Sequence, residues 1–127
     1  MKFQKTRHTA ETKLDISLSD DGAKSEINTG VGFLDHMLTL FSFHSQLTLT
    51  IRADGDVEVD DHHVTEDIGI VLGQLLLEMV KEKQSFSRYA TSYIPMDETL
   101  ARTVMDISGR PYLSFNCELS KEKVGTF

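Results

Sequence analysis

The chain has 127 residues, 39% of them hydrophobic and 26% charged, a composition typical of one soluble globular domain or of two small repeats that share a core. A net charge of −7 argues against nucleic acid and anionic membrane surfaces as partners, so an anionic substrate would need local arginines or a metal. The sequence has no membrane-spanning run and no signal-peptide pattern, and the single Cys117 excludes an internal disulfide framework, so we expect a cytoplasmic protein.

Hydrophobic periodicity predicts strands at both ends of the chain. Leu14, Ile16 and Leu18 alternate with polar residues, which is typical of a strand with one buried face. Asp20-Asp21-Gly22 indicates a hairpin turn, and the alternation around Cys117 predicts that it is buried or half-buried in a strand. The expected strands cover two runs within residues 2–18 and then residues 25–28, 47–53, 57–59, 89–94, 100–107 and 112–119.

Two helices are predicted where apolar residues recur at helical spacing. Asn28-Thr29-Gly30 offers capping groups for a helix over residues 31–44. Asp60 or Asp61 can cap a second helix that runs to about residue 83.

A weak internal echo links Ala10-Glu11-Thr12 to Asp97-Glu98-Thr99. It predicts a repeat of about 90 residues. We therefore expect a first α/β repeat over residues 1–86 and the N-terminal strands of a second repeat, without its helices, over residues 87–127.

The segment from Asp60 to Asp67 (Asp-Asp-His-His-Val-Thr-Glu-Asp) concentrates side chains that bind transition metals. It opens the second predicted helix, where the positive end of the helix dipole favours the neutral, metal-binding form of histidine. Asp60, Asp61 and Asp67 are near enough to orient the ring N–H groups. The alternative interpretation is a solvated polar helix start.

On a helical wheel, His62, His63 and Glu66 lie opposite the apolar stripe of their helix. The two histidines diverge by about 100°, which favours two metal positions, each completed by residues from elsewhere. Apolar or small residues on the same outward face predict a buried contact with another subunit or repeat; these are Ile70, Gly73 and Leu77.

The remaining histidines have less distinctive surroundings. His36 lies in the first helix at the border between its apolar and polar faces, and the downstream ligand candidates favour a metal-binding role for it as well. His44, near the end of that helix, could line a pocket. His8 is expected at the surface or in a hairpin.

Two arginines and several carboxylates are weaker candidates. Arg88 precedes a predicted strand and Arg110 lies beside a proline turn, and the arginine fork suits a phosphate group, although ordinary surface arginines are more common. Glu11 and the pair Asp97-Glu98 can supply general acid or base groups.

Taken together, these segments resemble one family, the imidazoleglycerol-phosphate dehydratases of histidine biosynthesis. The His-His-x-x-Glu pattern and the Leu-Asp-His-Met-Leu pattern form a specific pair, and the matching segments cover nearly the whole chain in the family's order. They are Arg7–Thr12, Gly30–Leu38, Asp60–Gly69, Arg88 with Tyr89, and Met96–Leu113.

The resemblance implies an α+β fold, a two-layer sandwich of tandem β-β-β-α-β-α repeats like ribosomal protein S5 domain 2. It implies a hydro-lyase that removes water from D-erythro-imidazole glycerol phosphate to give imidazole acetol phosphate. In such a reaction a metal on the substrate ring would stabilise an imidazolate-like intermediate. The family binds two Mn(II) ions per active site and assembles through trimers into a 24-subunit homo-oligomer, with its sites between subunits.

By motif position, the resemblance assigns site residues on this chain. His36, His62, His63 and Glu66 correspond to metal ligands. The expected catalytic groups are Glu11, Glu66 and His62, although the sequence does not assign the general base. The expected substrate contacts are Glu11, His36, His44, His62 and Glu66, with Arg88 and Arg110 on the phosphate.

The family's second repeat carries another His-His-x-x-Glu helix, a further histidine and a phosphate-binding lysine, and these 127 residues do not contain them. We therefore expect an incomplete second repeat and a chain that is truncated. If the chain is whole, we expect weak or no Mn(II) binding and no dehydration. The alternative function is an inactive fragment that serves only as an oligomeric metal-binding module; a metal hydrolase would use the same ligands but lacks further support.

Overall fold

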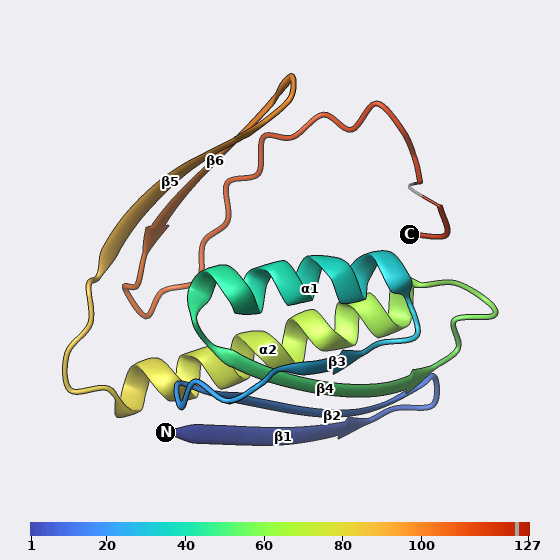
Figure 1. Cartoon of the computed structure of the whole chain (residues 1–127), viewed down its shortest axis with the longest axis horizontal. Coiled ribbons are helices and arrows are strands. Elements are labelled where there is room, and N and C mark those ends of the chain that lie inside the picture. The colour runs from blue at the N-terminus through green and yellow to red at the C-terminus, as the bar shows by residue number, and fades with distance from the viewer. Residues whose placement is uncertain (124) are drawn as a thin grey trace. The chain divides into compact units, whose positions relative to one another are not determined.

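The computed structural model describes residues 1–123 and 125–127, which form two compact units (Figure 1). The first unit comprises Met1–Glu82 with Lys121–Phe127, and the second comprises Lys83–Ser120. This division does not test internal symmetry, so the assignment of residues 1–86 and 87–127 to two repeats stays a prediction.

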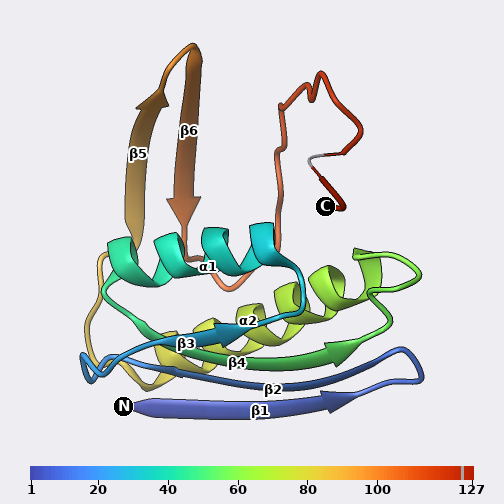
Figure 2. The ribbon, with the colours of Figure 1, turned by 45° about the vertical axis from the view of Figure 1, so that its right-hand side comes forward.

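The first unit is a four-stranded sheet with two helices on one of its faces (Figures 1 and 2). The strand order is β1-β2-β4-β3, in which β3 runs parallel to β4 and the other neighbours are antiparallel. This arrangement confirms the predicted α+β class and its two layers. The elements are β1 (Lys2–His8), β2 (Thr12–Ser19), β3 (Glu26–Asn28), α1 (Gly32–Ser45), β4 (Thr48–Gly55) and α2 (His62–Glu82).

The core lies between the sheet and the helices, where the period-two pattern of the strands meets the helical stripe. Ile16 and Leu18 on β2 are fully buried, as are Val64 and Leu75 on α2. Burial of each such side chain contributes about 1.5–3 kcal/mol relative to exposure. The hydrophobic pattern therefore fixes which face of α2 meets the sheet, and it leaves the opposite face exposed.

Gly55 permits a close approach between the end of β4 and the start of α2. A Cβ atom on this residue would lie 3.2 Å from both the Cγ2 atom of Thr12 and the Cβ atom of Val64. Those distances are tighter than ordinary van der Waals contact, so the absent side chain lets three elements converge. The start of α2 is thereby held against the end of the β1–β2 hairpin.

The turn at Asp20-Asp21-Gly22 exists, since Gly22 has a φ of +71°, but it does not close a hairpin. β4 lies between β2 and β3, so the hairpin prediction was wrong. The segment β3-α1-β4 instead forms a parallel pair joined by a helical crossover. Turn residues indicate only that the chain reverses its direction locally. Which strands pair depends on the connection between them, here a helical crossover.

Two predicted strands are absent from the described residues. Residues 57–59 form a turn in which the amides of Val59 and Asp60 both donate to the carbonyl of Asp56. Residues 112–119 form no strand, so Cys117 is exposed rather than buried, and both predictions were wrong. An alternating segment becomes a strand only when a neighbouring strand pairs with it.

The first helix begins differently from the prediction. Its N-cap is Val31, which provides no side-chain cap, and Asn28-Thr29-Gly30 therefore does not supply the cap residue. Thr29 instead acts from outside the helix: its backbone amide and its hydroxyl both donate to Asp35, at 2.8 and 2.6 Å. The Thr29 hydroxyl oxygen also accepts a hydrogen bond from the amide of Val31.

The second unit contains the hairpin of β5 (Tyr89–Met96) and β6 (Thr99–Asp106), which turns at Asp97-Glu98. Every residue of both strands is exposed. Within the described part of the chain, neither helix combines the length and apolarity needed to cross a bilayer.

Candidate functional site

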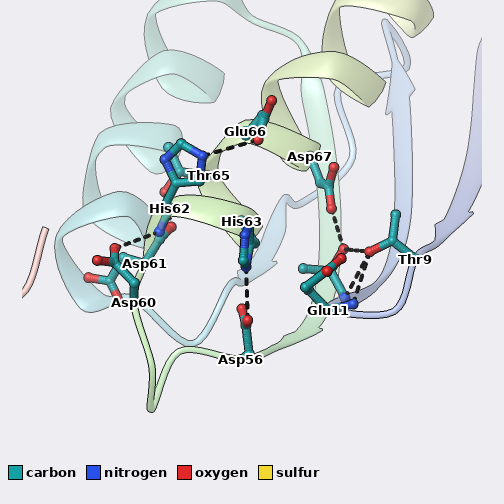
Figure 3. Close-up of polar contacts among 11 residues, drawn as sticks. Thr9, Glu11, Asp56, Asp60, Asp61, His62, His63, Thr65, Glu66 and Asp67 are labelled. Atoms are coloured by element: carbon teal, nitrogen blue, oxygen red, sulfur yellow. Dashed lines mark hydrogen bonds and ion pairs between the residues drawn. The ribbon is translucent and has the colours of Figure 1, made fainter.

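The candidate site lies around the first turn of α2 (Figure 3). Asp60 and Asp61 precede this turn and cap the helix, as predicted. The Asp60 carboxylate accepts a hydrogen bond of 2.9 Å from the His62 amide. The Asp61 carbonyl accepts the first helical hydrogen bond, from the amide of Thr65. These caps satisfy backbone donors that would otherwise lack partners at a helix start.

His62 and Glu66 lie one helical turn apart on the outward face of α2 (Figure 3). The Nε2 atom of His62 is 3.3 Å from the Oε2 atom of Glu66, and the two side chains are 68% and 56% exposed. The prediction that these groups face away from the core is confirmed. Ile70 and Leu77 are also exposed on α2, whereas the contact predicted to cover them stays a prediction.

His63 points elsewhere and pairs with Asp56 in the turn before α2. Its Nδ1 atom lies 2.8 Å from the Oδ2 atom of Asp56, and its ring meets that of His62 edge-on at 5.4 Å. The hydrogen bond with Asp56 raises the pKa of His63, with smaller contributions from the charges of Asp56, Glu11 and Glu66. In a neutral ring that donates from Nδ1, the Nε2 lone pair remains available to a metal.

Asp56 is a site residue that the sequence analysis missed. Asp60, Asp61 and Asp67 were expected to orient the histidine rings, but the ring of His63 is held by Asp56, seven residues earlier. The available signal was the acidic sequence Asp54-Gly55-Asp56 directly before the expected strand at residues 57–59. Loop conformation, rather than proximity in sequence, brings this carboxylate to the ring.

Two buried carboxylate oxygens at this site have no hydrogen-bond partner among the described residues. They are the Oδ1 atom of Asp56 and the Oδ2 atom of Asp61. A buried anionic oxygen without a donor is costly, and a cation would remove that cost. The start of α2 therefore has the electrostatic character of a cation site.

Glu11 lies in the loop between β1 and β2, which is at the same end of the sheet as the start of α2 (Figure 1). A shallow cavity of about 260 Å³ separates this loop from the turn that carries Asp56. Glu11 is also close enough to His63 for its charge to raise the pKa of that ring. The fold thus brings together Glu11, His62, His63 and Glu66, which the sequence analysis had selected separately.

Asp67 does not orient a histidine ring, so that expectation was wrong. Its carboxylate is buried and accepts hydrogen bonds from the hydroxyl of Thr12 and from the Nε atom of Arg7, the latter at 3.0 Å. Burial alone would raise the pKa of Asp67, but the hydrogen bonds from Thr12 and Arg7 and the charge of Arg7 lower it overall. One helix position beyond Glu66, the side chain faces the sheet rather than solvent.

The other histidines do not join this group. His36 is exposed on α1, and His44 is exposed with its ring edge-on to Phe43 at 5.1 Å. His8 is exposed at the end of β1, as predicted. Among residues 1–123 and 125–127, no three His, Cys, Asp or Glu side chains converge in a metal-binding arrangement, so the ligand set with His36 stays a prediction.

The two candidate phosphate-binding arginines lie in the second unit. Arg88 forms a 2.7 Å ion pair with Asp106, which raises the pKa of Arg88, and its guanidinium lies over the ring of Tyr89. Arg110 and Arg102 line a cavity of about 660 Å³ within that unit. Arg102 was not selected from the sequence. The phosphate-binding role of Arg88 and Arg110 stays a prediction.

Comparison with known proteins matches this chain to one family. A family model described as imidazoleglycerol-phosphate dehydratase matches residues 29–127. Imidazoleglycerol-phosphate dehydratases from Staphylococcus aureus strains JH9 and Newman are each 75% identical over 127 residues. These matches cover all of this chain and 66% of each relative, so the chain spans slightly less than two thirds of their length.

Solved structures agree with this match. The crystal structure of imidazoleglycerol-phosphate dehydratase from S. aureus N315 is 70% identical, with a TM-score of 0.90, and the match covers all of this chain and 69% of that one. The enzyme from Pyrococcus furiosus, in complex with (S)-C348, is 37% identical with a TM-score of 0.73, and the match covers 93% of this chain and 64% of that one. The chain belongs to the imidazoleglycerol-phosphate dehydratase family.

Proposed function

We propose that this chain takes part in the dehydration of D-erythro-imidazole glycerol phosphate to imidazole acetol phosphate, a step of histidine biosynthesis. The observation that carries the proposal is the pairing of His62 with Glu66 and of His63 with Asp56 at the start of α2. Family membership supplies the reaction, and this arrangement supplies residues suited to it. The proposed setting is the cytoplasm.

The residues present fit a divalent transition metal such as Mn(II). Imidazole and carboxylate donors suit this ion, and the unpartnered buried oxygens of Asp56 and Asp61 add negative potential. His62 and His63 fit the proposal of two ions, because the first ring is paired with Glu66 and the second with Asp56. The proposed ligands are His36, His62, His63 and Glu66, completed by residues outside this set.

Mn(II), when bound, would act as a Lewis acid toward the imidazole ring of the substrate and favour loss of the hydroxyl from the carbon attached to that ring. The chain's own carboxylates are the candidate proton acceptors. Glu66 is paired with His62, whereas Glu11 makes no side-chain ion pair among the described residues and lies beside the cavity near Asp56. We therefore assign proton removal to Glu11, with Glu66 and His62 contacting the reacting groups.

The reaction balances without a redox partner. The carbon attached to the ring loses its hydroxyl as water, the base takes the proton from the neighbouring carbon, and the resulting enol tautomerises to the ketone. Arg88 and Arg110 are proposed to bind the phosphate, since a guanidinium can form two parallel hydrogen bonds to it. His36 and His44 are proposed to line the substrate pocket.

The proposed assembly is a homo-oligomer, built through trimers into a 24-subunit shell. Exposed apolar side chains on the first unit support a subunit contact, because isolated domains rarely expose so many large ones. Those on the two helices are Phe33, Met37, Leu40, Phe41, Phe43, Ile70 and Leu77.

A dehydration assay on purified protein that contains these 127 residues together with the residues that complete the ligand set, with and without added Mn(II), tests the proposal. We expect turnover that depends on Mn(II), and we expect His62→Ala to abolish it while lowering Mn(II) affinity. His8→Ala, an exposed histidine on β1, is the matched control and should keep both properties. Mn(II) binding without turnover would instead support the alternative, an oligomeric metal-binding module.

A further inference from the structure

Asp67 joins α2 to the β1–β2 hairpin through one hydrogen bond from a charged group, Arg7, and one from a neutral group, Thr12. Its side chain is 9% exposed, and its two carboxylate oxygens accept one hydrogen bond each, from the hydroxyl of Thr12 and from the Nε atom of Arg7. An ionised carboxylate accepts hydrogen bonds and donates none, so the single hydroxyl proton of Thr12 is committed to Asp67.

The network continues from Thr12 into the loop that carries Glu11. The hydroxyl oxygens of Thr9 and Thr12 are 3.1 Å apart, and because the Thr12 proton is engaged, Thr9 must be the donor. The Thr9 oxygen then accepts from the backbone amides of Glu11 and Thr12, at 3.2 and 3.0 Å. A continuous chain of hydrogen bonds therefore runs from Asp67 to the backbone of Glu11.

The two ends of this chain of contacts adjoin the proposed site. Asp67 directly follows Glu66 on α2, and Thr12 directly follows Glu11 on the hairpin. We propose that Asp67, acting through Thr12 and Thr9, is a positioning residue that sets the distance between the Glu11 loop and the histidines of α2. The inference rests on the proposed function, in which Glu11 accepts the substrate proton.

A positioning contact and a purely structural contact can be distinguished by the turnover of the folded molecules. Removal of a purely structural contact lowers the free energy of unfolding and leaves the folded molecules with normal turnover. Loss of a positioning contact lets the carboxylate of Glu11 shift in folded molecules, and a shift of about 1 Å can cost up to about a hundredfold in rate. The ligand side chains of α2 are not displaced by the same change, so metal affinity should be retained.

Thr12→Val tests this with little change in side-chain volume, and Thr12→Ser restores the hydroxyl. In Thr12→Val we expect kcat to fall about tenfold or more, an unchanged Mn(II) dissociation constant by electron paramagnetic resonance, and faster hydrogen exchange at the Glu11 amide. Thr12→Ser should recover most of the turnover. Thr6→Val, at an exposed position of β1, is the matched control and should leave all three readouts unchanged.

Turnover of Thr12→Val within twofold of the unaltered chain, in folded protein, would overturn the inference. Equal losses of Mn(II) affinity and turnover would also overturn it, because they would indicate a general disturbance of α2. If the unaltered chain shows no turnover, the proposed function fails separately. In that case hydrogen exchange tests the inference. An exchange rate at the Glu11 amide that is the same in Thr12→Val as in the unaltered chain would contradict it.

Discussion

At the scale of single residues, the contact between His63 and Asp56 makes the pKa of the His63 ring depend on the carboxylate of Asp56. The hydrogen bond with Asp56 raises the pKa of His63 above its ordinary value of 6.5. In the metal-free chain, Asp56→Asn should bring this pKa back toward 6.5, measured by NMR titration of the ring protons. A pKa that does not fall would mean that the remaining carboxylates control the ring.

The sign of the accompanying change in stability follows from linkage. Because the folded-state pKa of His63 is raised, the pair contributes stability that is fully present below about pH 6.5 and is lost as the pH rises through the folded pKa. The stability difference between the metal-free chain and Asp56→Asn should therefore shrink toward alkaline pH. Urea unfolding at several pH values measures it.

At the scale of elements, the packing of α2 on the sheet supplies the stability of the first unit. Leu75 is fully buried, so Leu75→Ala should lower the free energy of unfolding by about 2–5 kcal/mol. Leu77, on the same helix, is 49% exposed in the single chain, and Leu77→Ala is the matched control at a protein concentration low enough to keep subunits apart, with an expected change below about 0.5 kcal/mol. Urea denaturation followed by circular dichroism compares them; similar losses would contradict the assigned faces of α2.

The link between α2 and the hairpin should also weaken in acid. The pKa of Asp67 is lowered because the hydrogen bonds from Thr12 and Arg7 and the charge of Arg7 outweigh the opposing effect of burial. A carboxylate whose pKa is lowered in the folded state stabilises the fold at pH values above its ordinary pKa of 3.8. This stabilisation is lost as the pH falls through the folded-state pKa. Asp67→Asn should therefore unfold with a weaker dependence on pH below 4, as measured by acid titration of the circular dichroism signal.

At the scale of the whole molecule, the two units differ in how much they bury. The first has a continuous core, whereas every residue of β5 and β6 is exposed. A two-stranded hairpin alone is only marginally stable in water. Amides of β5 and β6 should therefore exchange with deuterium faster than those of β2 and β4 in dilute solution, as measured by NMR or mass spectrometry. Equal protection would show that another surface covers the hairpin.

The local signals in the sequence were sufficient for the elements with a clear hydrophobic period. β2 and α2 were predicted because their apolar residues recur at strand and at helical spacing, and these residues, such as Ile16 and Leu75, are buried. The strand at residues 112–119 was wrong because alternation alone does not provide a pairing partner. The hairpin at Asp20-Asp21-Gly22 was wrong for a related reason, since β4 is inserted between β2 and β3.

The amino-acid sequence is sufficient to predict the donor atoms at the start of α2 and their direction away from the core. His62, His63 and Glu66 occupy positions that helical geometry assigns once the apolar stripe is known. Their surroundings depend on tertiary contacts: Asp56 binds the ring of His63, Glu11 lies beside the same turn, and Asp67 binds the hairpin. These contacts join separate segments through a loop and a sheet edge, and periodicity along one element carries no information about them.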